Sequence, residues 1–210
     1  LLKYLLLANK PFSDMIRKLL TILSCFFAVP TIAQDVKSTE SKKMEWFDDA
    51  KLGIFIHWGI YAVDGISESW AFFNNYISHD NYLKQLDGFT GKNYNPQEWV
   101  NLIEESGAKY TVITSKHHDG IALWDTKGEK GLSTAKDAYA KKDVLTPFIK
   151  AVKASNLKTG IYYSLPDWSH PYYDIITRTQ KRYDIAQDTK RWGKFVDYYQ
   201  GQLEELSQQF

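Results

Sequence analysis

The strongest constraint on the fold is an alternation of short apolar runs with amphipathic helical patterns. Three runs, residues 52–56, 110–115 and 158–164, are rich in β-branched and aromatic side chains and have the length of single strands. Helical patterns follow them at residues 95–107, 143–155 and 190–209, and a shorter one precedes them at 45–51. Strands that alternate with helices predict an α/β fold in which a parallel sheet is covered by helices.

The helix after the first strand has clear boundary signals. Asn95 can cap it, Pro96 suits its first turn, and Gly107 can end it. The start of the next helix is open, because Pro147 lies near it and either Asp143 or Thr146 could be the cap. Residues 60–94 and 125–142 read as loops, and the first of these is unusually long for a compact domain.

All three expected strands run into segments that carry His or Tyr. A (β/α)8 barrel places its active site at the carboxyl ends of its strands, so we expect this architecture. Three strands cannot close an eight-stranded barrel, and the chain stops after a helix, where another strand is due. We therefore expect the N-terminal portion of a (β/α)8-like (TIM) barrel, truncated after about three strands. A doubly wound open sheet is the alternative, although no Gly-rich phosphate loop follows any of the three strands.

The N-terminal region has the pattern of a targeting segment. Residues 15–18 are a short basic start and residues 19–29 an apolar run, and a cut after Ala33 is plausible. We interpret residues 1–14 as upstream read-through, 15–33 as a signal peptide, 34–44 as a flexible leader and 45–210 as the incomplete barrel. These assignments predict an exported protein, periplasmic or secreted. Lipoprotein anchoring through Cys25 is a second, lower-ranked interpretation, because it leaves apolar residues at the mature end.

Charge and cysteine content exclude several classes of function. The formal net charge of +1 provides no basic surface for nucleic acid. The apolar run is shorter than the roughly 20 residues that a spanning helix needs, so no membrane span is expected. Cys25 is the single cysteine, and a mature chain that lacks it has neither a disulfide framework nor a thiol nucleophile. No cofactor is expected, and the oligomeric state stays open.

The candidate site residues follow the expected strands. His57 follows the first strand, and His117 and His118 follow the second, within Lys-His-His-Asp-Gly. Tyr162 and Tyr163 end the third strand, where neighbouring side chains point opposite ways, so only one of them can face a shared pocket. These groups could instead be a solvated turn, a satisfied core histidine or a zinc site, but no HExxH-type spacing supports zinc.

Three motifs together resemble the α-L-fucosidases of glycoside hydrolase family 29. The first is Trp-Phe-Asp-Asp-Ala-Lys-Leu-Gly-Ile-Phe-Ile-His-Trp-Gly at residues 46–59. The second is Lys-His-His-Asp-Gly at 116–120, followed by Leu-Trp at 123–124. The third is Gly-Ile-Tyr-Tyr-Ser at 160–164 with Asp-Trp at 167–168. The match spans about residues 44–210, in the family's order and spacing.

The resemblance implies a fucose-binding pocket and a retaining mechanism without metal. By position, His57, His117 and His118 correspond to residues that bond the sugar hydroxyls, and Tyr162 is expected to face the same pocket. The family's Glu-Trp pair is matched by Glu68 and Trp70, which are separated here by one residue.

The resemblance also implies that the catalytic carboxylates lie elsewhere. The family's nucleophilic Asp and its acid/base follow later strands, so no catalytic residue is expected within this chain, and the 210 residues alone should be inactive. Asp119 and Asp125 are interpreted as structural carboxylates. His79 and His170 are expected on the surface or in loops. Trp58, Trp124 and Trp168 could be core residues or could stack on a sugar.

The expected function is therefore exo-acting hydrolysis of terminal α-L-fucose from an oligosaccharide or glycoconjugate. Two alternatives remain open at this point: a non-catalytic sugar-binding relative, and a glycosidase of the same fold that acts on another sugar.

Overall fold

The computed structural model describes residues 42–210, which fall into two compact units divided after Ala50. In the first unit, residues 42–50 form a helix that includes the last residues of the expected leader. The predicted signal peptide and the segment before it lie outside the described residues. No helix in the described part of the chain has the length and apolar character needed to cross a membrane.

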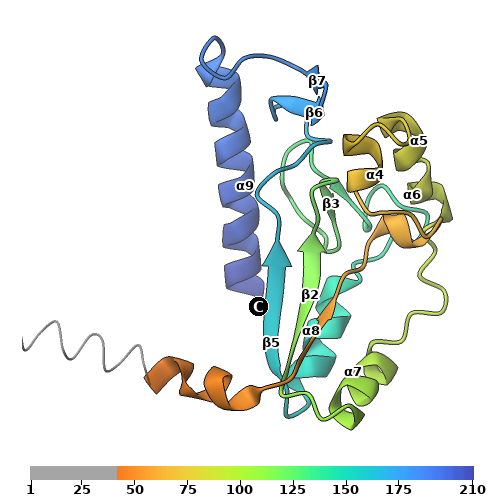
Figure 1. Ribbon diagram of the computed structural model, residues 1–210, viewed down its shortest axis with the longest axis vertical. Helices are drawn as coiled ribbons and strands as arrows, with labels where there is room; N and C mark the ends of the chain where they lie inside the picture. Colours follow the sequence, from red (N-terminus) through yellow and green to blue (C-terminus); the bar gives the residue numbers. More distant parts are fainter. Residues whose placement is uncertain (1–41) are drawn as a thin grey trace, which may run out of the picture. The chain divides into compact units, whose positions relative to one another are not determined.

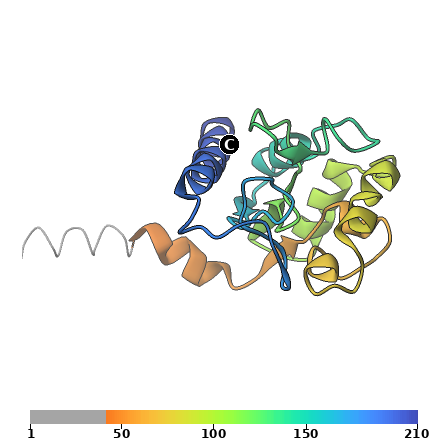
Figure 2. The same ribbon diagram turned by 90° about the horizontal axis from the view of Figure 1, so that it is seen from above.

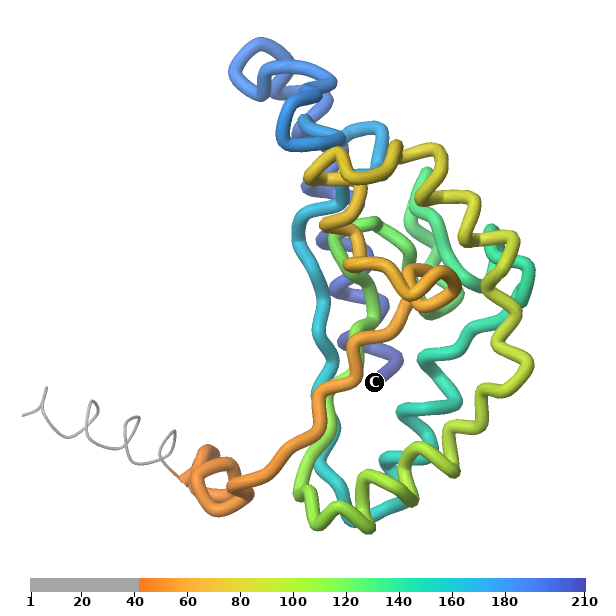
Figure 3. The backbone as a smooth tube through the Cα atoms, turned by 45° about the vertical axis from the view of Figure 1, so that its right-hand side comes forward, coloured from red at the N-terminus to blue at the C-terminus, as the bar shows by residue number. Residues whose placement is uncertain are grey.

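The second unit is built on three parallel strands, as the sequence predicts. They are β1 (Gly53–Ile56), β2 (Tyr110–Lys116) and β5 (Lys158–Tyr163). Strand β2 lies between the other two, with Gly53 opposite Tyr110 on one side and Thr114 opposite Tyr162 on the other. The three strands run side by side in Figure 1 and Figure 3. Their carboxyl ends therefore lie at one edge of the sheet.

Helix α7 (Pro96–Glu105) connects β1 to β2 and begins and ends as predicted. The Asn95 side chain accepts hydrogen bonds from the backbone N–H groups of Gln97, at 3.1 Å, and Glu98, at 3.4 Å. Gly107 follows the helix at φ 82°, a left-handed conformation that glycine adopts without strain. The buried face of α7 carries Val100 and Ile103.

Helix α8 (Leu145–Lys153) connects β2 to β5, and its start differs from both expectations. The Asp143 carboxylate accepts hydrogen bonds from the Thr146 backbone N–H at 2.8 Å and from the Thr146 hydroxyl at 2.7 Å. The N-cap position itself is Val144, which makes no side-chain cap bond, so neither expected residue occupies it. Asp143, one residue earlier, holds the first turn through Thr146. The apolar face of the helix is fully buried in the core and consists of Leu145, Phe148, Ile149 and Val152.

The last helix, α9 (Thr189–Gln209), runs alongside β5 in Figure 1. It is tied to the sheet by a buried amide: Gln202 accepts a hydrogen bond from the Tyr163 hydroxyl at 2.9 Å and donates one to the Thr126 hydroxyl at 3.1 Å. The Glu205 carboxylate accepts a hydrogen bond from the Trp124 indole N–H at 2.9 Å. These contacts fix the segment that follows β2 against a helix more than 60 residues further along the chain.

The segment between β1 and α7 differs from the expected irregular loop, because short helical pieces lie within it. They are η1 (Ile60–Ala62), α4 (Trp70–Phe73), α5 (His79–Leu83) and α6 (Gln85–Gly88). Elements of three to five residues are too short to show a helical period in the sequence. Pieces α4 and α5 lie at the end of the sheet to which the strand arrows point, beside β6 (Ile175–Thr177) and β7 (Gln180–Lys181) (Figure 1; Figure 2 shows this end from above).

Two further short strands extend the sheet beyond β2. Strand β3 (Ile121–Ala122) pairs antiparallel with β2, and β4 (Leu132–Ser133) pairs parallel with β3. They turn the segment after β2 back over the sheet, so Ile121 and Ala122 are both buried. The observed architecture is a mixed α/β unit with two consecutive strand–helix–strand connections.

Candidate functional site

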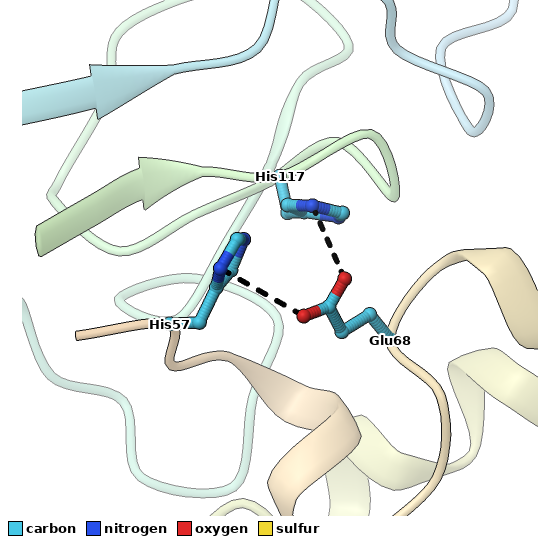
Figure 4. Close-up of side chains that lie close together, drawn as sticks. All are labelled: His57, Glu68 and His117. Atoms are coloured by element: carbon cyan, nitrogen blue, oxygen red, sulfur yellow. Dashed lines mark ion pairs between the residues drawn. The ribbon is translucent and has the colours of Figure 1, made fainter. Parts of the chain in front are cut away.

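The residues that follow β1 and β2 meet at the carboxyl edge of the sheet. His57 comes directly after β1, His117 comes directly after β2, and Glu68 reaches both from the loop after β1 (Figure 4). The Glu68 carboxylate lies 3.8 Å from Nδ1 of His57 and 3.5 Å from Nε2 of His117. The two imidazole centroids are 4.8 Å apart. Parallel strands bring these groups together because their ends share one edge.

The tripeptide Glu68–Ser69–Trp70 contacts all three histidines of the site. Besides the two Glu68 contacts, the Ser69 hydroxyl lies 2.5 Å from Nδ1 of His117, and the Trp70 ring lies 5.5 Å from that of His118. Glu68 has φ 52°, a left-handed conformation that is uncommon outside glycine. The residue that separates Glu68 from Trp70 is thus a hydrogen-bond partner of the site. Ser69 was missed by the sequence analysis, although it lies inside the segment singled out there.

His118 is held by the segment that follows β5. Its Nδ1 is hydrogen-bonded to the Ser164 hydroxyl, which donates to the Pro166 carbonyl at 2.9 Å. The His118 ring lies 4.8 Å from the Trp168 ring. Since the Ser164 proton is directed to Pro166, Nδ1 of His118 carries its own proton, and Nε2 is left as an acceptor. Ser164 is the second partner that the sequence analysis missed.

Tyr162 and Tyr163 point to opposite sides of β5, as alternation along a strand requires. The Tyr162 ring lies 5.8 Å from His57 and 6.1 Å from His117. The Tyr163 hydroxyl is bonded instead to Gln202 on α9. Phe55, which is 51% exposed, lies against both Tyr162 and His57 and gives the site an aromatic border.

Burial makes the paired histidines weak bases. The pKa of His117 is lowered to about 3, first by burial and then by the neighbouring His118 and His57. The pKa of His118 is also lowered, by burial, His57 and Lys116. Both rings are therefore neutral near pH 7, and each offers one hydrogen-bond donor and one acceptor. Neutral donor–acceptor pairs suit hydroxyl groups better than they suit anions.

Behind the histidines lies a buried ion pair that the sequence analysis did not find. The Lys116 ammonium is 3.2 Å from the Asp167 carboxylate, and both residues are at most 1% exposed. Asp167 also accepts hydrogen bonds from the Tyr198 hydroxyl at 3.1 Å and from the His170 backbone N–H at 2.8 Å. The sequence shows Lys116 next to the His pair, but its ion-pair partner could not be identified because Asp167 lies 51 residues away.

Asp119 is buried, and its side-chain hydrogen bonds are made to groups other than the histidines. It accepts hydrogen bonds from the Tyr82 hydroxyl at 2.5 Å and from the Ile121 backbone N–H at 3.0 Å. Burial raises its pKa to about 6, although the bonds from Tyr82 and Ile121 act in the opposite direction. Asp125 is exposed at the surface, where its carboxylate lies 4.0 Å from the Lys136 ammonium. These positions favour structural roles for both carboxylates.

His170 lies in the loop between β5 and β6, which agrees with one of the two expected positions, but it is not at the surface. Its side chain is buried, with the ring stacked 4.0 Å from that of Tyr198 on α9. The expected surface position is wrong because the covering helix lies more than 20 residues further along the chain. His79 opens α5, is half-buried, and is hydrogen-bonded to the Ser169 hydroxyl at 2.8 Å.

The three tryptophans considered for sugar stacking have different surroundings. Trp124 and Trp168 are buried, at 0% and 4% exposed, which indicates core roles for both. Trp58 packs among aromatic residues beside a cavity of about 340 Å³, which is lined in part by Phe89, Tyr94 and Trp99. This cavity offers apolar surface but little that could do chemistry. The face formed by His57, Glu68, His117 and His118, called the histidine face below, is therefore the better candidate site.

These features define an α/β protein with a polar, aromatic-bordered site at the carboxyl ends of its parallel strands. Comparison with known proteins gives the family. The profile described as "Alpha-L-fucosidase" matches residues 28–210. The chain belongs to the alpha-L-fucosidase family.

Individual relatives agree with this assignment. The plasma alpha-L-fucosidase of Homo sapiens is 37% identical over 177 residues, which are 75% of this chain and 38% of that protein. The crystal structure of alpha-L-fucosidase isoenzyme 1 from Paenibacillus thiaminolyticus superposes with a TM-score of 0.68 at 31% identity, over 79% of this chain and 40% of that one. A GH29 alpha-L-fucosidase from Bacteroides thetaiotaomicron, trapped as a covalent intermediate with 2-fluoro-fucosyl fluoride, has the same TM-score and identity, over 80% and 38%. The chain thus spans about two fifths of the length of these relatives.

Proposed function

We propose that this protein is the N-terminal part of an exo-acting α-L-fucosidase that removes terminal fucose from oligosaccharides or glycoconjugates. The observation that supports this most strongly is the convergence of His57, Glu68 and His117, with the Tyr162 ring close by, in a chain of the alpha-L-fucosidase family. The groups come from three separate segments and surround one open face. That face is lined with hydrogen-bond donors and acceptors, which include the neutral rings of His117 and His118 and the Glu68 carboxylate, and it is bordered by aromatic rings.

In this proposal the site holds the sugar by its hydroxyl groups. Nε2 of His118, the Glu68 carboxylate and the Tyr162 hydroxyl supply acceptors and a donor, while His57 and His117 complete the ring of polar groups. Trp70 is 41% exposed and provides an apolar surface next to His118, which suits the methyl group of a deoxy sugar. Fixed partners for His117 and His118 mean that little ordering is left to occur on binding.

The reaction proposed for the complete protein is retaining hydrolysis through two displacements. Such a mechanism needs a nucleophilic carboxylate and an acid/base roughly 5–5.5 Å apart. The covalent intermediate trapped in the Bacteroides relative is the species that this route forms. In the described part of this chain, Asp119 and Asp167 are each 1% exposed and engaged in hydrogen bonds, so neither is available to attack a sugar. We propose that neither catalytic carboxylate is among these residues and that Glu68, the carboxylate of the site, binds the sugar.

Binding and turnover test this proposal separately. Titration calorimetry of the 210-residue chain with L-fucose should show binding, with L-galactose and D-fucose as matched sugars. His117→Ala should weaken binding by at least tenfold. Tyr162→Phe should weaken it by roughly fivefold, the value of one hydrogen bond of about 1 kcal/mol. Tyr163→Phe is the control, because its hydroxyl is bonded to α9, and it should leave affinity unchanged.

Turnover is measured with 4-nitrophenyl α-L-fucopyranoside. The 210-residue chain should release no nitrophenol, whereas the product of the whole open reading frame should release it. Fucose binding without turnover by the longer protein would favour the non-catalytic relative. Faster hydrolysis of another glycoside would assign the fold to a different sugar. Release by the 210-residue chain itself would refute the placement of the carboxylates.

We also infer that the protein is exported through the segment at residues 15–33. N-terminal sequencing of the mature protein from its producing cell should begin at Gln34. A lipid-modified Cys25 at the mature N-terminus would support anchoring instead.

A further inference from the structure

Three potential metal ligands converge at the histidine face. Nδ1 or Nε2 of His57, a carboxylate oxygen of Glu68 and a ring nitrogen of His117 all lie within 4.8 Å of one another. Figure 4 shows the Glu68 carboxylate between the two imidazoles, with one oxygen directed at each. Two histidines and one carboxylate are a ligand set that binds zinc in catalytic sites, where a fourth position stays open.

The separations are somewhat longer than those that a small divalent ion requires. Zinc lies about 2.0–2.2 Å from nitrogen and oxygen ligands, so the edges of its tetrahedron are roughly 3.3–3.5 Å long. Nε2 of His117 lies 3.5 Å from one Glu68 oxygen, and Nδ1 of His57 lies 3.8 Å from the other. With one ligand atom taken from each residue, the three atoms lie within 4.8 Å of one another, so the side chains must move closer together to hold one ion. The His57 side chain is 36% exposed, which leaves its ring free to turn toward the other two ligands.

A hydrogen bond to a neighbouring group also orients one of the ligands, as is usual for metal ligands in proteins. A metal-binding histidine commonly bonds its other ring nitrogen to a neighbouring group, which fixes the tautomer and the ring plane. His117 meets this condition, since its Nδ1 lies 2.5 Å from the Ser69 hydroxyl while Nε2 faces Glu68. His118 does not belong to the group of ligand atoms that lie within 4.8 Å of one another, which consists of His57, Glu68 and His117.

We propose that His57, Glu68 and His117 bind a divalent transition-metal ion of the zinc type, at the place where the sugar hydroxyls are held. The proposal of a metal site depends only on these three side chains and not on the proposed function. The consequence for function rests on the proposed sugar site: metal and fucose compete for the same groups, so zinc acts as a competitive inhibitor.

The test is calorimetric titration of the 210-residue chain with ZnCl2, with CoCl2 as a spectroscopic probe. One zinc ion should bind per chain, and Co2+ should give the intense visible bands of a tetrahedral or five-coordinate site. His57→Ala, Glu68→Gln and His117→Ala should each weaken zinc binding by more than the roughly 10- to 100-fold that loss of an outer partner costs. Ser69→Ala should fall within that range.

His79→Ala is the matched control, because His79 is half-buried and bonded to Ser169 outside the cluster. It should leave zinc affinity unchanged. Far-ultraviolet circular dichroism of each variant separates a lost ligand from a lost fold. The proposal is overturned if the unmodified chain does not bind zinc, or if folded His57→Ala and His117→Ala variants bind it as well as His79→Ala does.

A second titration distinguishes the metal site from the sugar site. Fucose affinity is measured with and without saturating zinc. Zinc binding without fucose binding supports the metal site and refutes the proposed sugar function. Fucose binding without zinc binding supports the proposed sugar function and refutes the metal site. Independent binding of both overturns the claim that they share groups.

Discussion

Breaking the buried ion pair between Lys116 and Asp167 should destabilise the protein strongly. Lys116 is 0% exposed and Asp167 is 1% exposed, so Lys116→Met leaves a carboxylate in the interior with two hydrogen-bond donors but no counter-charge. Removing one partner of such a pair typically costs about 3–5 kcal/mol. With a urea dependence of about 2 kcal/mol per molar, the unfolding midpoint should fall by roughly 1.5–2.5 M.

The reverse variant, Asp167→Asn, should be pH-dependent. Burial lowers the pKa of Lys116, and the Asp167 carboxylate opposes this shift. Without the carboxylate, the folded-state pKa falls further below the unfolded value. The unfolded chain then binds more protons, so the free energy of unfolding of Asp167→Asn should be higher at pH 9 than at pH 7.

A double-mutant cycle isolates the pair itself. Lys116→Met/Asp167→Asn removes both charges and should recover at least about 2 kcal/mol relative to the sum of the single changes. Urea unfolding followed by tryptophan fluorescence and by circular dichroism gives each free energy, with Lys136→Met as an exposed-lysine control. A coupling energy below about 0.5 kcal/mol, or an unchanged midpoint for Lys116→Met, would show that the pair does not hold the site in place.

Three further predictions concern other parts of the structure. The pKa of His117 is about 3 in the folded protein, whereas its reference value is 6.5. The contribution of neutral His117 to the free energy of unfolding is therefore complete above pH 6.5 and is lost as the pH falls toward 3, by up to about 5 kcal/mol. Urea midpoints between pH 4 and 7 should drop more steeply for the unmodified protein than for His117→Gln. Gly120→Ala should destabilise by more than about 2 kcal/mol, because residue 120 has φ 81° and a Cβ there would lie 2.0 Å from Asp167 Oδ1; an unchanged melting temperature would contradict this. Asn95→Ala should cost about 1 kcal/mol through loss of the α7 cap, whereas Asn95→Asp should restore most of it in the same thermal measurement.

The regular elements could be predicted because their signals are local. The three parallel strands and helices α7 and α9 lie within two residues of their expected positions, since apolar runs and capping residues belong to the segment that they define. The short helices of residues 60–94 could not be found in this way. A piece such as α4, with four residues, is shaped by what it packs against rather than by its own period.

The site was predictable in outline but not in its supporting contacts. Strand alternation placed Tyr162 near the histidines, and parallel strands brought His57 to His117. The hydroxyls of Ser69 and Ser164 and the carboxylate of Asp167 could not be predicted as partners, because each contact joins segments more than 40 residues apart. The burial of His170 under α9 was missed for the same physical reason.

The tripeptide at residues 68–70 also limits how this protein can be re-engineered. Its three consecutive side chains each meet a different part of the histidine cluster, so inserting or deleting one residue here would displace every one of those contacts together. Loop exchange between homologues will therefore succeed only when donor and recipient agree in length at this point. Attempts to alter sugar preference one residue at a time are better directed at Phe55, whose ring borders the cluster without anchoring it.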